Sequence, residues 1–398
     1  MKMTRVKLDK QMIVKILLTV LISYTIIFPA DRLNIKEVLL AVTLVMGYFG
    51  RKIHIDRKIV MFGVLFPILT ISYSLIRGND FGSAISFGYV WTFILLIPII
   101  KEYNYNIKNV FLVSTYVVAM IINVIMLADL FGIVPIKENG IASFFISINE
   151  LQGLGKGIVS TIGYSIFYKS CPLIIISYAY YVYNKKVVKS LPLLLALFAC
   201  GTRANFIVAI ILTMVIPAIY WKSSRKTRVI FALVIVLTIA LLPIAYNKLT
   251  ELNSIKYKNS DTIKIEDSKI IINDLKSSPL NLLLGTGVGS SFMSSRGHEM
   301  TTYEVSAIDY LRQTGIVGIT VLIIFIGIIV KSLKKRKQYW MLVSIIGYVA
   351  VAFTNPLLVT STSFMAYLFV ICYNEKLKER TEGIIEDDQR NTSIHNLG

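Results

Sequence analysis

Long apolar runs separated by short polar segments make up most of the chain. Runs of about 17–25 apolar residues are long enough to cross a bilayer as helices. The pattern therefore predicts an all-α integral membrane protein with about twelve spans. The predicted spans cover residues 11–29, 36–50, 58–76, 83–100, 107–131, 158–183, 189–201, 203–221, 229–246, 308–330, 339–354 and 357–373.

The first apolar run follows a basic N-terminus, as in a secretory signal peptide. The run Gln11–Ile27 is longer than a typical signal-peptide core, and no clear small-x-small cleavage site follows it. We therefore predict an uncleaved first membrane span.

Basic residues are distributed unequally between the loops on the two sides. If successive spans cross the membrane in opposite directions, the segments on the side of the N-terminus contain 26 Lys and Arg, and the segments on the other side contain 13. Because cytoplasmic loops carry the basic excess, both termini are predicted to be cytoplasmic.

The same rule divides residues 189–221 into two spans. Basic segments flank this run at 184–189 and 222–228, so both of its ends are expected in the cytoplasm and a hairpin tip is expected near Arg203. The first arm is about 20 Å long at 1.5 Å per residue, against a hydrocarbon core of about 30 Å. Arg203 is therefore expected below the outer surface, facing a cavity where it could bind a phosphate. The alternative is an interfacial arginine that reaches the lipid head groups.

Composition agrees with a membrane protein. The chain is 55% hydrophobic and only 16% charged, which excludes an ordinary soluble globule. The net charge of +19 could suggest nucleic acid, but the loop positions of the basic residues account for it, and we predict no nucleic-acid partner. The three cysteines have no metal-like spacing and are predicted to be buried apolar residues.

Two outer loops are expected within a single membrane domain, residues 1–373, at 132–157 and 247–307. In the larger loop, between the ninth and tenth spans, Asp267 and Ser268 could cap an amphipathic helix, Lys269–Lys276, on the outer membrane face. Residues 374–398 lack apolar periodicity and are predicted to form a partly disordered cytoplasmic tail.

The stretch Asn281–Ile319 is the most polar region beside a span. It begins with three alternating glycines at 285, 287 and 289, which permit unusual backbone conformations or close approach. Further along, Glu304 and Arg312 are spaced to share one helix face. Glu304 or His298 could remove a proton from a sugar hydroxyl. The alternative is a solvated loop with an ordinary ion pair.

Other signals are weaker. Lys169 is expected near the middle of the span 158–183, where a lysine suggests a functional site unless the span is misplaced and the lysine is interfacial. The run Gly285–Gly289 lacks the context of a nucleotide-binding motif, and no residues have metal-ligand spacing, so no cofactor or metal is predicted.

Three segments together resemble the superfamily of Wzy-type polysaccharide repeat-unit polymerases and O-antigen ligases. These are the hairpin tip Gly201–Ile210, the helix-Pro-Leu-Gly-x-Gly run from Lys269 to Gly289, and the exit helix with Leu311, Gly315 and Gly318. Glu304 stands at the position where ligases commonly carry a histidine, which favours a polymerase. The tip has Thr202 and Asn205 where the family usually has serine and glycine.

The resemblance implies a C-type glycosyltransferase architecture in the inner membrane. Its donor and acceptor would be oligosaccharides on undecaprenyl pyrophosphate, and its product would be O-antigen or capsule. Membrane lipid and a chain-length regulator protein are the other partners implied. Glu304 and His298 would be catalytic. The predicted substrate-binding residues are Arg203, Arg296, Arg312, Lys169, Lys156 and Lys269.

Two other functions fit the same pattern. One is an O-antigen ligase that transfers finished glycan to lipid A core. The other is a flippase for lipid-linked oligosaccharides, although such transporters usually have paired broken helices in two halves.

Overall fold

The computed structural model describes residues 9–30, 34–148, 150–156, 164–221 and 258–377. These residues are mostly helical, with two short antiparallel hairpins, which agrees with the predicted helical membrane class. Six of the described helical segments are long and apolar enough to cross a membrane, whereas the predicted number of twelve is not established. The six are Lys10–Ile27, Arg57–Ile76, Phe81–Glu102, Ile107–Leu130, Arg203–Tyr220 and Ser306–Lys335.

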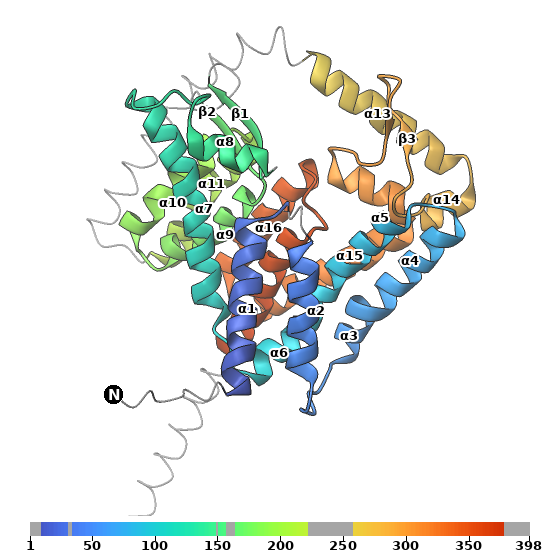
Figure 1. Ribbon diagram of the computed structural model, residues 1–398, viewed down its shortest axis with the longest axis horizontal. Coiled ribbons are helices and arrows are strands. Elements are labelled where there is room, and N and C mark those ends of the chain that lie inside the picture. The colour runs from blue at the N-terminus through green and yellow to red at the C-terminus, as the bar shows by residue number, and fades with distance from the viewer. Residues whose placement is uncertain (1–8, 31–33, 149, 157–163, 222–257, 378–398) are drawn as a thin grey trace, which may run out of the picture.

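The elements follow one another along the chain as shown in Figure 1. They are α1 (Lys10–Ile27), α2 (Ile35–Tyr48), α3 (Arg57–Val60), η1 (Met61–Leu65), α4 (Phe66–Ile76), α5 (Phe81–Thr92), η2 (Phe93–Leu95), α6 (Leu96–Glu102), α7 (Ile107–Leu130), α8 (Gly140–Ser147), β1 (Leu151–Lys156), β2 (Tyr164–Tyr168), η3 (Cys171–Leu173), α9 (Ile174–Tyr183), α10 (Val187–Ala199), α11 (Arg203–Tyr220), α13 (Lys258–Lys276), α14 (Pro279–Leu284), β3 (Phe292–Met293), β4 (Glu299–Met300), α15 (Ser306–Lys335) and α16 (Tyr339–Thr354). Residues 361–377 are also helical.

Helix α16 connects two groups of helices. It packs against α9 and α11 on one side and against α15 on the other. The pair α4 and α5 lies beside α14 and α15, and the pair α1 and α7 lies at the other side of the bundle (Figure 1). The segments α8, β1, β2, α13 and β3 all lie at the upper end in this view, opposite to the start of α1.

An aromatic cluster around Trp91 holds together the helices on the α15 side of α16. The indole is fully buried and contacts the rings of Phe62, Phe66, Phe325 and Phe364, with centroid separations of 4.9–6.4 Å. Buried aromatic rings contribute large apolar areas and prefer these edge and offset contacts. The cluster therefore holds α5 against η1, α15 and the helix of residues 361–377.

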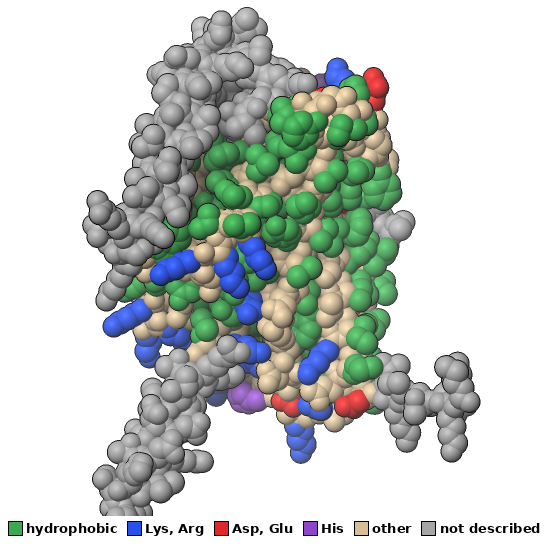
Figure 2. Space-filling view, turned by 90° about the vertical axis from the view of Figure 1, so that its left-hand side faces the viewer, with side chains coloured by type: hydrophobic (Ala, Val, Ile, Leu, Met, Phe, Trp, Pro, Cys, Tyr) green, Lys and Arg blue, Asp and Glu red, His purple; other side chains and the backbone are tan. Residues whose placement is uncertain are grey.

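One face of the bundle is apolar at mid-height and charged toward its lower end. Hydrophobic side chains cover much of the middle of the face in Figure 2, whereas Lys and Arg side chains gather toward its lower part. The lower end also carries the ion pairs Arg51–Glu102 (3.0 Å) and Lys101–Glu375 (2.6 Å). An apolar middle with a basic end, as on this face, is typical of a membrane protein.

The predicted helix over 158–183 is wrong. Residues Tyr164–Tyr168 form β2, which pairs antiparallel with β1, and of residues 164–183 only η3 and α9 are helical. Burial in β2 alternates residue by residue, as expected for a strand rather than a helix. Lys169 therefore lies between the strand and a short helical turn, and not in the middle of a membrane helix.

Two other expectations need correction. Helix α13 begins at Lys258, so Asp267 lies within the helix and does not cap it. Glu304 precedes the start of α15, so it shares no helix face with Arg312. The predicted division of residues 189–221 into two helices is confirmed, because α10 ends at Ala199 and α11 starts at Arg203. The predicted span 229–246 and nearly all of the predicted tail lie outside the described residues.

Candidate functional site

The glycine loop that follows α14 is seated on a break in α15. Gly315 has φ 63° and ψ −166°, which interrupts the helix and frees carbonyl groups in the preceding turn. The backbone N–H groups of Thr286 and Gly287 donate to the carbonyls of Arg312 (2.8 Å) and Gln313 (3.1 Å). Buried backbone groups need such partners. The loop therefore satisfies the hydrogen-bonding groups that the helix break exposes.

The end of α4 clamps the same loop from the other side. The Tyr73 hydroxyl donates to the Gly285 carbonyl (2.8 Å), and the Asn79 amide donates to the Thr286 carbonyl (3.0 Å). The Ser74 hydroxyl accepts from the N–H of Val288 (2.8 Å). The loop is thus fixed between two membrane helices.

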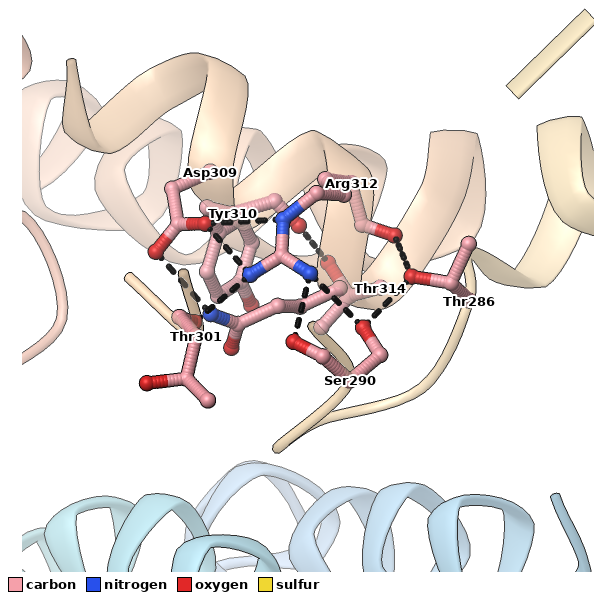
Figure 3. Close-up of polar contacts among 8 residues, drawn as sticks. Thr286, Ser290, Thr301, Asp309, Tyr310, Arg312 and Thr314 are labelled. Atoms are coloured by element: carbon pink, nitrogen blue, oxygen red, sulfur yellow. Dashed lines mark hydrogen bonds and ion pairs between the residues drawn. The ribbon is translucent and has the colours of Figure 1, made fainter. Parts of the chain in front are cut away.

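Arg312 of α15 lies at the centre of the contacts that hold the next part of the loop (Figure 3). Its guanidinium is fully buried and donates to the Asp309 carboxylate through Nε and Nη2 (3.0 and 2.8 Å). It also donates to the carbonyl and hydroxyl of Ser290 and to the carbonyl of Thr301. These contacts use all five N–H donors of an arginine. In this structure Arg312 therefore organises the loop and presents no donor to a ligand.

A second carboxylate holds the tip of the loop. Asp267 of α13 is 4% exposed and accepts the hydroxyl of Ser294 (3.1 Å) and the N–H of Ser295 (2.7 Å). Burial raises the pKa of Asp267, but the hydrogen bonds and the charge of Arg296 outweigh it and bring the pKa below its ordinary value. Beneath this contact lies a small apolar cluster of Ile271, Leu275, Phe292 and Tyr303.

We expect Asp267→Asn to loosen the segment 291–303 by about 1–3 kcal/mol, since a buried charged acceptor is lost. The pKa of Asp267 is lower in the folded state than in the unfolded state. Its ionised form therefore stabilises the fold above the unfolded-state pKa, and this stabilisation is lost as pH falls through the folded-state pKa. Hydrogen exchange at pH 7 and pH 3 should therefore show acid-induced opening in the wild type and a smaller pH dependence in the variant. Asp274→Asn, on the exposed side of the same helix, is the matched control. Equal protection in both variants would contradict the prediction.

A groove runs between this loop and the start of α5. It consists of a cavity of about 430 Å³ and an adjoining one of about 150 Å³, which share Phe87, Thr302 and Gln313. The remaining polar lining residues of the two cavities are Asp80, Ser83, Ser86, Thr301, Tyr303, Ser306, Asp309, Tyr310 and Thr360.

The groove has the chemistry of a site for polyhydroxylated ligands. Hydroxyl and amide side chains can each donate and accept hydrogen bonds, as sugar hydroxyls do. The ring of Phe87 stacks on Tyr310 with 5.8 Å between centroids and supplies an apolar surface. Asp80 adds a carboxylate at the rim, where the N–H of Ser83 (2.7 Å) lowers its pKa. Asp309 adds a second carboxylate on the wall.

The predicted catalytic residues lie on the loop but do not line the groove. Glu304 is 65% exposed and pairs with Lys264 of α13 at 2.9 Å. His298 is exposed next to the strand β4. Their predicted roles stay predictions.

The predicted anion-binding residues are separated in space. Arg203 is exposed at the start of α11, a helix that packs against α9 and α16 and lies on the opposite side of the upper end from α13 (Figure 1). Arg296 and Lys269 are exposed near the loop and on α13, respectively. Lys156 is the last residue of β1, and its side chain lies outside the described atoms.

Sequence reasoning missed most of the groove. Ser86 and Phe87 come from α5, about two hundred positions before the loop, and no motif marks them. Asp309 carries a local signal, since it stands three positions before Arg312 at helical spacing. That spacing could have identified it as the partner of Arg312.

Comparison with known proteins adds no assignment. The chain matches no protein-family model and no curated protein.

Proposed function

We propose that the chain is an integral-membrane glycosyltransferase that polymerises oligosaccharide repeat units linked to undecaprenyl pyrophosphate. The product would be a surface polysaccharide, either O-antigen or capsule, assembled at the outer leaflet of the inner membrane. The observation that carries the proposal is the hydroxyl- and amide-lined groove beside the glycine loop, at one end of an apolar helix bundle. Such a groove fits a sugar chain whose lipid carrier stays in the membrane.

The acceptor sugar would occupy the groove against Phe87. Asp309, on the groove wall, would orient or deprotonate the attacking hydroxyl, because a carboxylate within reach of a hydroxyl can act as a general base. Its side chain is 14% exposed, and its bonds to Arg312 (2.8 Å) and Gln313 (2.9 Å) hold it in one orientation. Glu304 and His298 remain alternative bases if the loop closes over a bound substrate.

The lipid pyrophosphate would need positive charge to stabilise the leaving group. Arg203 is the proposed residue, since a guanidinium binds phosphate oxygens in a bidentate manner. The groove lining includes no Lys or Arg among the described residues. The proposal therefore requires the pyrophosphate to lie outside the groove, toward α11, with only the acceptor inside it.

The direct test is elongation by the purified full chain in liposomes. Lipid-linked repeat units extracted from a host strain that lacks the protein serve as both donor and acceptor. Chains longer than one repeat, formed without lipid A core, are the expected result. Transfer that occurs only after lipid A core is added would identify a ligase, and transbilayer movement without elongation would identify a flippase. Either outcome would overturn the polymerase proposal.

A groove-filling substitution tests the acceptor site. Ser86→Trp should reduce elongation at least tenfold without lowering expression, because the indole would occupy the cavity beside Phe87. Ile85→Trp, at the neighbouring position that does not line the groove, should leave elongation within about twofold of wild type. Product size on gels reports both. Normal long chains from Ser86→Trp would show that the groove does not bind the acceptor.

A further inference from the structure

A second cavity lies at the basic end of the bundle, far from the groove along the helices. It has a volume of about 480 Å³ and is bounded by α3 and η1, by η2 and α6, by the last turns of α15, and by the helix of residues 361–377. Ligand sites commonly measure about 300–1,000 Å³. The cavity is therefore large enough for a lipid head group and the adjoining part of its chains.

The inner wall of this cavity is apolar. Phe62, Ile97, Phe325 and Ile329 line it, and all four are buried in the protein core. These residues belong to three separate helical segments that pack around the Trp91 cluster. A small hydrophilic ligand would gain little from such a wall, whereas an acyl chain would be removed from water.

The mouth of the cavity carries an excess of positive charge. Four lysines and two acids line it, and one of the lysines, Lys101, pairs with Glu375. The side chains of Lys58, Lys331 and Lys335 are exposed and form no ion pair with a carboxylate within the described part of the chain. Three unpaired ammonium groups around one opening favour a phosphate.

A buried acceptor completes the site. Asn374 lines the cavity and is 3% exposed, and its amide nitrogen donates to the Ser332 hydroxyl (3.0 Å). Its Oδ1 accepts no hydrogen bond from the described residues. An unsatisfied buried acceptor costs about 1–3 kcal/mol, so a ligand with a hydroxyl donor would be favoured at this position.

We propose that this cavity binds the head group of an anionic glycerophospholipid, with the phosphate at Lys331 and Lys335, a head-group hydroxyl at Asn374, and an acyl chain along the apolar wall. Basic pockets between membrane helices are suited to such head groups. Phosphatidylglycerol combines the phosphate and the hydroxyl donor. This lipid site is independent of the proposed glycosyltransferase activity.

The test is lipid binding by the full chain, measured by native mass spectrometry in detergent. Phosphatidylglycerol should bind at least tenfold more tightly than phosphatidylcholine. The double variant Lys331→Gln and Lys335→Gln should weaken phosphatidylglycerol binding by about 30-fold, since each lysine near a phosphate contributes about a factor of five. The matched control removes two exposed lysines outside the cavity, Lys189→Gln and Lys334→Gln, and should change binding less than twofold.

Three results would overturn the proposal. The first is equal loss in the cavity variant and its control, and the second is equal affinity for the two lipids. The third concerns the source of the phosphate. Inorganic phosphate at 10 mM should displace little phosphatidylglycerol, and complete displacement would assign the lysines to a soluble phosphate compound instead.

Discussion

Replacing Arg312 with methionine is expected to lower the free energy of unfolding by about 3–5 kcal/mol, because one partner of a buried ion pair is removed. The Asp309 carboxylate would lose two donors, and the carbonyls of Ser290 and Thr301 would each lose one. The shape of the groove depends on these contacts, so elongation should be lost together with thermal stability. Melting in detergent and the liposome assay measure the two effects.

Two comparison variants distinguish the loss of any arginine from this region from the loss of the buried Arg312–Asp309 ion pair. Arg296→Met removes an exposed arginine from the same loop and should change stability by no more than about 0.5 kcal/mol. Combining Arg312→Met with Asp309→Asn removes the uncompensated charge and should recover part of the lost stability but not the activity. A melting temperature for Arg312→Met equal to that of Arg296→Met would show that the buried network does not hold the loop.

The second large effect is expected from Gly315→Ala. The backbone of Gly315 has φ 63° and ψ −166°, a region that is nearly restricted to glycine and costs other residues about 1–3 kcal/mol. A methyl group there would also lie 2.3 Å from the carbonyl oxygen of Leu283 and 2.5 Å from the nitrogen of Gly285. The glycine loop could then no longer pack against the break in α15, so elongation should fall at least a hundredfold.

Gly327 provides the control in the same helix. A methyl group at Gly327 would meet no atom within 4 Å in the described chain, and alanine is the better helix former by up to about 1 kcal/mol. Gly327→Ala should therefore keep full activity. Protease cleavage of residues 285–303 would report loop release in Gly315→Ala alone. Wild-type activity and protease resistance in Gly315→Ala would refute the proposed seating of the loop.

Local patterns were sufficient for the six long apolar helices and for the glycine loop. Apolar run length located the six helices that are long and apolar enough to cross a membrane, and the two flanking basic segments identified the break between α10 and α11. The three glycines at 285, 287 and 289 all have positive φ, in agreement with the conformational freedom expected of them. These features depend on residues close in sequence, where periodicity and residue type carry the information.

Run length failed where an apolar run contains a strand. Residues Tyr164–Tyr168 are all strand-forming or small, and their burial alternates, but the apolar run around them is long enough to suggest a helix. Pairing with β1 decides the matter, and a single sequence does not reveal that pairing. For this reason Lys169 follows a strand, and does not lie in the middle of a helix as predicted.

The sequence by itself determined that the chain is a helical membrane protein, which segments are polar, and where the backbone can bend. Only the tertiary structure decided that Arg312 pairs with Asp309 rather than facing a ligand, and that α5 supplies half of a groove whose other half lies more than two hundred residues later. The physical reason is that hydrophobic periodicity reports which side of a helix is buried, but not against which distant segment it packs.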